Sequence, residues 1–301
     1  MEQPRVKNAE QIEVVKTPSG FRVIMKEILR DKVALISLIF LILVAGFVYG
    51  ISLFLDQEQI VTVDLFAIFH PPSSEFWLGT DHGGRDVFGQ LIIGTRNSLT
   101  IGIAVTALSG IIGLVVGLVA GYFGGQVDNV LMRVLDFFLI LPTTMLIIAF
   151  VAIVPNYSIL QFTLIFTAFM WMSMARLIRS KALQESSLEY IQASKTLGTP
   201  NSKIIFSHLL PNLSSLVIVN MTLSLAANIG IESGLSFLGF GFPESTPSLG
   251  TLMSYATNPQ IFELRPWVWL PASILVLVLM LCINNVGQAL KRATDAKQRR
   301  G

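Results

Sequence analysis

The residues that could do chemistry in this chain are led by a polar stripe in an apolar run. Asn220, Ser224, Asn228, Glu232 and Ser236 recur at every fourth position. A step of four residues advances about 40° around a helix, so Ser224, Asn228 and Glu232 lie within about 80° of one another. Polar groups on a membrane-spanning helix face a bundle interior or a wet cavity. The stripe therefore predicts a translocation pathway in which Glu232 meets a cationic group. Equally open is a structural role, in which Glu232 pairs with or hydrogen-bonds to a neighbouring helix.

Catalytic and cofactor chemistry is not indicated by any motif. The Gly-rich stretch GTDHGGRD, which begins at Gly79, has Arg85 where a phosphate-binding loop requires lysine. We therefore expect no ATP hydrolysis, no catalytic residue and no cofactor in this chain. The three histidines are dispersed along the sequence, so we also expect no metal site.

The elements that must carry the polar stripe are membrane spans. Of 301 residues, 52% are hydrophobic and 13% are charged, and the mean hydropathy is +0.67. This composition excludes an ordinary soluble globule. Predominantly apolar runs long enough to cross about 30 Å of hydrocarbon recur six times. They predict an all-α membrane protein with six transmembrane helices, at 33–55, 97–122, 134–154, 159–175, 213–237 and 267–290. Pro142 should kink the third.

These spans define the domain organisation. We predict a tail with a lead-in helix at 1–32, a transmembrane domain at 33–290 and a second tail at 291–301. No cleaved signal is expected before the first span. Within the second span, Gly110, Gly113, Gly117 and Gly121 predict a face that the backbone of another helix approaches closely.

Positive charge predicts the orientation of the spans. Eighteen of the 21 Lys and Arg residues fall in the two tails, in the loop after the second span and in the stretch 176–211, which contains most of a polar segment at 186–212. Only Arg85, Arg96 and Arg265 fall in the loops at 56–96 and 238–266. The positive-inside rule then places both termini and segment 186–212 in the cytoplasm, and the two loops on the outer side of a cell membrane.

Segment 186–212 is predicted to form two short helices at a sharp corner. Ser186 and Glu189 have the spacing of a capping box, and Gly198 should end the first helix. Thr199 and Pro200 suit the N-cap and first position of the second helix. One face of the first helix carries Tyr190, Ala193, Ser194 and Leu197.

The segment resembles the cytoplasmic signature of ABC importer permeases. That signature reads Glu-Ala-Ala, three residues, Gly, nine residues, Ile, one residue, Leu-Pro. Here it is matched, with Gln for Glu, Ser for Ala and His for Ile, by Gln192, Ala193, Ser194, Gly198, His208, Leu210 and Pro211. The preceding Glu189-Tyr190 pair is typical of the dipeptide, oligopeptide and nickel branch. So are the stretches 235–241 and 247–250, and an outer-loop motif made here by Leu78, Gly79, Thr80, Asp81, Gly84, Arg85 and Asp86.

The resemblance implies a permease subunit of a type I ABC importer that transports peptides. It also implies a second permease chain, two ATPase subunits that bind ATP and Mg, and an extracytoplasmic substrate-binding protein. Alternatives are a nickel or chelated-cation permease and an ion-coupled secondary transporter. We expect 189–197 to be a coupling helix in a groove of an ATPase, with a hairpin on the lipid surface as the alternative. Asp81, Arg85 and Asp86 are expected to face the binding protein, unless Arg85 and Asp86 pair with each other.

Overall fold

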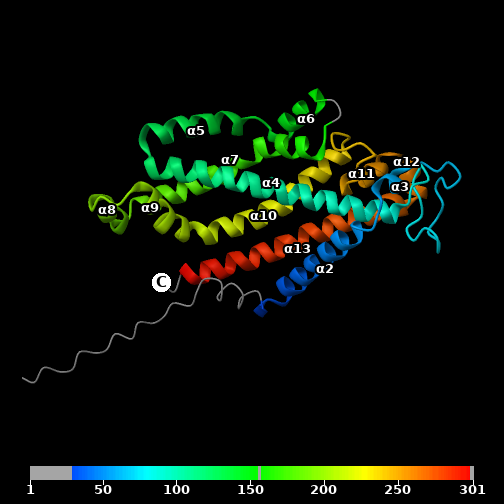
Figure 1. The fold of residues 1–301 in the computed structure, drawn as a ribbon, viewed down its shortest axis with the longest axis horizontal. Coiled ribbons are helices and arrows are strands. Elements are labelled where there is room, and N and C mark those ends of the chain that lie inside the picture. The colour runs from blue at the N-terminus through cyan, green and yellow to red at the C-terminus, as the bar shows by residue number, and fades with distance from the viewer. Residues whose placement is uncertain (1–28, 155–156, 299–301) are drawn as a thin grey trace, which may run out of the picture.

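The computed structural model describes residues 29–154 and 157–298, which form a bundle of long helices (Figure 1). Its elements are α2 (Lys32–Ser52), α3 (Gln57–Val61), α4 (Val87–Phe123), α5 (Gly125–Ile140), α6 (Thr143–Ile153), α7 (Ile159–Ser186), α8 (Glu189–Thr196), α9 (Asn201–Ile204), η1 (Ile205–Leu209), α10 (Leu210–Phe237), α11 (Leu249–Ser254), η2 (Tyr255–Thr257), α12 (Pro259–Leu264) and α13 (Pro266–Gln298). η1 is a π-helix and η2 a 3-10 helix. The described residues form no strand, and the predicted N-terminal tail falls mostly outside them.

Five helical stretches are long and apolar enough to cross a membrane: α2, α4, α7, the run from α9 to α10, and α13. A sixth span requires α5 and α6 together, and these are bent by 80° at their break. The bend predicted at Pro142 is confirmed, but it separates two helices, α5 and α6, instead of kinking one. Leu141 has an extended backbone (ψ 140°), because a residue before proline avoids the α-helical region, and Pro142 is the N-cap of α6.

Two helices are longer than the sequence predicts. α4 begins ten residues before the predicted second span because Asp86 caps it: its carboxylate accepts hydrogen bonds from the Phe88 and Gly89 N–H groups. The last part of the predicted loop 56–96 is therefore helical. α13 likewise continues to Gln298, through most of the predicted C-terminal tail.

The predicted close approach at the glycines of α4 is confirmed. A Cβ atom on Gly113, Gly117 or Gly121 would lie 2.6–2.7 Å from the carbonyl oxygens of Trp171, Ala175 and Arg179, one after another along α7. Real Cβ atoms essentially never come so near, so only glycine allows these backbones to pack. Gly110 faces Met221 of α10 instead.

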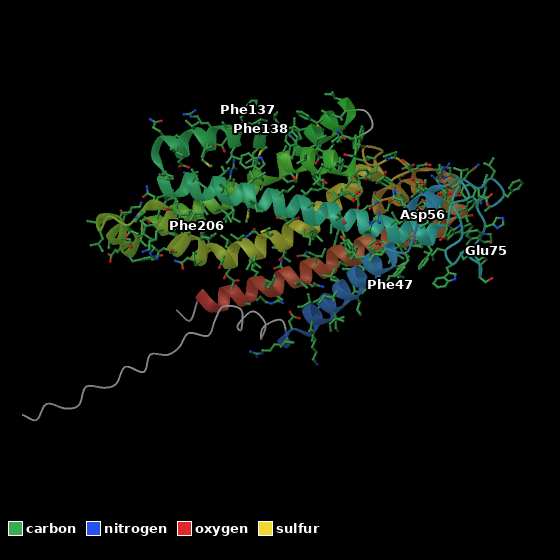
Figure 2. The ribbon with its side chains drawn as sticks, in the orientation of Figure 1. Phe47, Asp56, Glu75, Phe137, Phe138 and Phe206 are labelled. Atoms are coloured by element: carbon green, nitrogen blue, oxygen red, sulfur yellow. The ribbon has the colours of Figure 1, made fainter. Side chains whose placement is uncertain are left out.

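The bundle has two different ends (Figure 1). We call the end formed by α8, α9 and η1 the hairpin end, and the end formed by residues 53–86 and 238–265 the loop end. α3, α11 and α12 lie at the loop end, whereas α13 finishes toward the hairpin end. Figure 2 places Asp56 and Glu75 at the loop end and Phe206 at the hairpin end. Between the ends, the sides of the helices expose apolar residues such as Phe47, Ile111 and Leu277, as a lipid-facing surface requires.

Candidate functional site

Ser186 and Thr199 do not cap the helices at the hairpin end. Ser186 is the last residue of α7, and its hydroxyl donates to the Leu183 carbonyl at 2.9 Å and to the Gly121 carbonyl at 3.4 Å. Leu188 is the N-cap of α8 and Pro200 that of α9, both without a side-chain hydrogen bond. The predicted capping box and Thr199 cap are therefore wrong. The predicted stop at Gly198 is confirmed, since its φ of +76° is a conformation that favours glycine.

The second short helix does not end before the fifth span. α9, η1 and α10 follow one another without a break, so a helical run of 37 residues begins at Asn201 and reaches Phe237. The π-helical turn precedes Pro211, which lacks the N–H that an α-helix would donate to the carbonyl of Ser207. Widening of the helix at this point relieves the clash that proline causes inside a regular helix.

The hairpin is anchored by few side chains and exposes the face that the sequence singled out. Ile191, Ile204 and Leu209 are fully buried, in a cluster with residues of α4 and α7. In contrast, the Leu197 side chain is 85% exposed and Tyr190 is 43% exposed. Much of this face of the hairpin is therefore left uncovered by the rest of the chain.

Tyr190 of α8 contacts residues of three other elements, α7, η1 and α10. Its hydroxyl accepts a hydrogen bond from Asn212 Nδ2 at 2.8 Å and lies 3.3 Å from a Glu185 carboxylate oxygen. Its ring meets His208 edge to face, with centroids 6.2 Å apart. Burial, then the Glu185 carboxylate, raises the pKa of Tyr190, so the phenol remains a hydrogen-bond donor at neutral pH.

The other predicted coupling residues lie around this contact. Gln192 donates to the Ser186 carbonyl at 2.8 Å, and the Ser194 hydroxyl donates to the Tyr190 carbonyl at 2.8 Å. The remaining members of the predicted set are exposed or half-buried: Glu189, Ala193, Gly198, Leu210 and Pro211.

The polar stripe of α10 lines a cavity along part of its length. The cavity, of about 260 Å³, lies between α4, α7 and α10. Asn220, Ser224 and Asn228 contribute to it, together with Thr106 and Ser109 of α4 and Ser173 of α7. The Asn228 amide donates to the Thr106 hydroxyl at 2.9 Å. Three of the four predicted pathway residues are thus brought together, next to polar groups that the sequence did not single out.

Glu232 does not line this cavity. Its side chain is fully buried, and its carboxylate accepts hydrogen bonds from Ser98 at 2.8 Å and Ser236 at 3.0 Å, with Ser233 at 3.4 Å. Within the described part of the chain it forms no ion pair. In this conformation the structural alternative holds, and Glu232 is out of reach of a cationic ligand.

At the loop end, Arg85 does not pair with Asp86. Its Nε donates to the Asp81 carboxylate at 2.9 Å, and its Nη2 donates to Glu244 at 2.7 Å. Asp81 is fully buried and also accepts from Gln90 at 2.9 Å, and Arg85 is 5% exposed. The predicted Arg85–Asp86 pair is therefore wrong, and buried Asp81 and Arg85 cannot contact a docked protein in this conformation.

Charge and burial have opposite effects on the pKa of Arg85. Burial lowers the pKa of Arg85, but Tyr255, Glu244 and Asp81 together raise it above its ordinary value. Burial, then Asp81, raises the pKa of Tyr255, so its hydroxyl stays protonated near Arg85. Desolvation raises the pKa of Asp86 against the opposing effect of its bonds to Gly89 and Phe88.

Glu244, Tyr255 and Ser98 were missed at the sequence level. Glu244 and Tyr255 reach Arg85 from positions 159 and 170 residues away, and Ser98 reaches Glu232 across 134 residues. One contact of Glu232 was indicated by the sequence, because Ser236 lies four residues further along the same helix and bonds to it. Among the described residues, no three His, Cys, Asp or Glu side chains lie close enough to hold a metal ion.

The long apolar helices, with a polar cavity between three of them, define a helical multi-pass membrane protein. Residues 113–297 match the family described as binding-protein-dependent transport system inner membrane component. The chain belongs to this family, and it is thus a multi-pass component of an inner-membrane transport system that depends on a binding protein.

Several relatives match over nearly their full length. The oligopeptide transport system permease protein OppC of Lactococcus lactis (strain SK11) is 45% identical, with 91% of this chain and 94% of the relative covered. OppC of Bacillus subtilis (strain 168) is 32% identical over 100% and 98%, and the dipeptide permease DppC of the same strain is 36% identical over 90% and 84%.

A solved structure supports the fold. The MetNI methionine ABC transporter in an inward-facing conformation contains a chain with a TM-score of 0.55 and 22% identity, and the match covers 69% of this chain and 97% of that one. This chain therefore has the fold of an ABC importer permease, as the signature at 192–211 predicted.

Proposed function

We propose that this chain is a permease subunit of an ATP-driven importer of peptides, oligopeptides or dipeptides. Relatives named as oligopeptide and dipeptide permeases, up to 45% identical, support the peptide class. The chain is non-catalytic: two partner ATPase subunits bind ATP and Mg and do the hydrolysis. A second permease chain completes the pathway, and an extracytoplasmic binding protein delivers the peptide.

The observation that carries this proposal is the hairpin end. α8 and its C-cap residue offer exposed Tyr190 and Leu197, and the helix is seated on the bundle through buried Ile191. This arrangement fits a coupling helix in an ATPase groove. We place the hairpin end and both termini in the cytoplasm, in keeping with the basic residues of these segments.

The cavity that Asn220, Ser224 and Asn228 help to line belongs to the proposed pathway. Amide and hydroxyl groups there offer donors and acceptors to a peptide backbone without selecting any side chain. The loop end faces outward in this proposal and receives the binding protein. Asp81 and Arg85 lie buried beneath that surface, and Arg85 positions Glu244 on it through a hydrogen bond.

The test uses Leu197→Asp and a matched Leu264→Asp on α12. Both leucines are highly exposed, at 85% and 67%, and lie at opposite ends of the molecule. Surface substitutions leave the fold nearly unchanged. After affinity purification from membranes, Leu197→Asp should lose the ATPase subunits, whereas Leu264→Asp and the wild-type chain should retain them. ATPases that stay bound to Leu197→Asp, or that never accompany the wild-type chain, would overturn the proposal.

A further inference from the structure

The polar stripe of α10 stops lining the cavity at Asn228. Four residues further toward the loop end is Glu232. It does not line the cavity, and its side chain has an exposed fraction of 0%. Glu232 is turned about 40° around the helix from Asn228, and side chains of neighbouring elements cover it.

Two elements far apart in sequence form the cover. Ser98 of α4 donates its hydroxyl hydrogen to Glu232 at 2.8 Å and accepts the Leu249 N–H of α11 at 3.1 Å. A relay of two hydrogen bonds therefore runs from the backbone of α11 through α4 to α10. Beside it, the Asn97 amide donates to the Pro247 carbonyl at 2.8 Å. We call Glu232, Ser98, Leu249 and Ser236 the Glu232 cluster.

Glycine contacts seat α11 tightly in this position. A Cβ on Gly250 would lie 2.5 Å from the Ser233 carbonyl oxygen, and one on Gly94 would lie 3.0 Å from the Ser248 backbone. α11 thus rests directly on the backbones of α4 and α10, where Leu249 holds the Ser98 hydroxyl that covers Glu232.

The chemistry of the cluster suits a contact that opens. The carboxylate is held by hydroxyl groups and by no cation within the described residues. Water can replace hydroxyl donors at a carboxylate with little change in hydrogen bonding, whereas breaking a buried ion pair leaves a charge without its partner.

We propose that the Glu232 cluster is the gate at the loop end of the pathway. In the conformation described here it is closed. When α11 and Ser98 separate from Glu232, the carboxylate joins Asn220, Ser224 and Asn228 and offers an anionic contact to the amino terminus of an entering peptide. The assignment of a peptide rests on the proposed function; the gate itself does not.

Thiol accessibility in the assembled transporter, reconstituted in vesicles, tests the gate. Cys282 is the only cysteine of the chain, so Cys282→Ser gives a clean background. Ser233→Cys reports on the cluster, because Ser233 is only 2% exposed and its hydroxyl lies 3.4 Å from the Glu232 carboxylate. A charged maleimide added at the loop end should leave this cysteine unlabelled at rest and should label it after trapping with ATP and vanadate. Protection in both states would overturn the gate.

Variants of the cluster sharpen the test. Glu232→Gln keeps the volume but turns one acceptor into a donor, and Ser98→Ala removes the relay. The matched control Thr95→Val removes a buried hydroxyl that bonds only to Leu91 of its own helix. Losing one hydrogen bond to a buried carboxylate should raise labelling of Ser233→Cys at rest by about ten-fold.

Equal labelling at rest in Ser98→Ala, Glu232→Gln and Thr95→Val would overturn the gate. Thermal unfolding of each purified variant identifies any that has lost its fold. If either Ser98→Ala or Glu232→Gln is excluded in this way, the labelling of the other is compared with that of Thr95→Val. The comparison at rest needs neither ATP nor peptide, so it still tests the gate if the ATPase subunits prove absent and the proposed function fails.

Discussion

The two ends of the bundle are held together in opposite ways. At the loop end, Asp81 and Arg85 are buried and each makes several polar contacts, so one substitution disturbs many bonds. At the hairpin end, three buried aliphatic side chains seat two short helices, and the surface around Gly198 is open. The difference indicates a loop end tied together by polar contacts around Arg85 and a hairpin end that leaves part of its surface uncovered.

The largest expected effect breaks the loop end. Arg85→Ala leaves the Asp81 carboxylate buried without its cation, which should lower the free energy of unfolding by about 3–5 kcal/mol. The matched control is Arg292→Ala, which removes a half-exposed ion pair with Asp31 and should cost at most about 1 kcal/mol. Thermal unfolding in detergent measures both. Similar losses for the two variants would mean that the contacts of Arg85 stabilise the protein no more than a surface ion pair does.

A pair of glycines with the same backbone conformation compares the ends directly. Gly84 and Gly198 have φ angles of +73° and +76°, so alanine costs about 1 kcal/mol of backbone strain at either. A Cβ on Gly84 would also lie 1.9 Å from the Asp64 carbonyl oxygen, whereas Gly198 has no atom within 4 Å. Gly84→Ala should therefore lose about 2 kcal/mol more than Gly198→Ala, from overpacking. Equal unfolding temperatures would contradict the proposed difference in packing.

The smallest expected effect lies at the hairpin end. Tyr190→Phe removes the bonds to Asn212 and Glu185 and should cost about 0.5–1.5 kcal/mol. Because the folded state raises the pKa of Tyr190, its contribution is fully present below the unfolded pKa of about 10 and is lost as pH rises through the folded pKa. Denaturation from neutral to alkaline pH should show the two chains converging only above that range. A constant difference would exclude the phenol as its source.

Local patterns predicted the features that depend on one helix at a time. The apolar runs indicated the spans, the glycines of α4 indicated the close approach of another helix, and Gly198 indicated the end of α8. Each of these follows from helical geometry or from the conformational freedom of glycine. Both can be recognised from residues that are close together in the sequence.

Features that join distant segments could not be predicted. The step of four residues placed Glu232 on the same face as Asn228, but which side chains cover that face depends on Ser98 and Leu249. The suggested cap at Ser186 failed because its hydroxyl bonds back to Leu183 and across to Gly121. In both cases a tertiary contact overrides a plausible local pattern.

The unbroken helical run from Asn201 to Phe237 has a mechanical consequence. At about 1.5 Å per residue it acts as a lever roughly 55 Å long, with the hairpin at one tip and Glu232 close to the other. A tilt of about 5° about one tip displaces the opposite tip by about 5 Å, which exceeds the length of any hydrogen bond in the cluster. A small tilt of this one helix is thus geometrically sufficient to part Glu232 from Ser98.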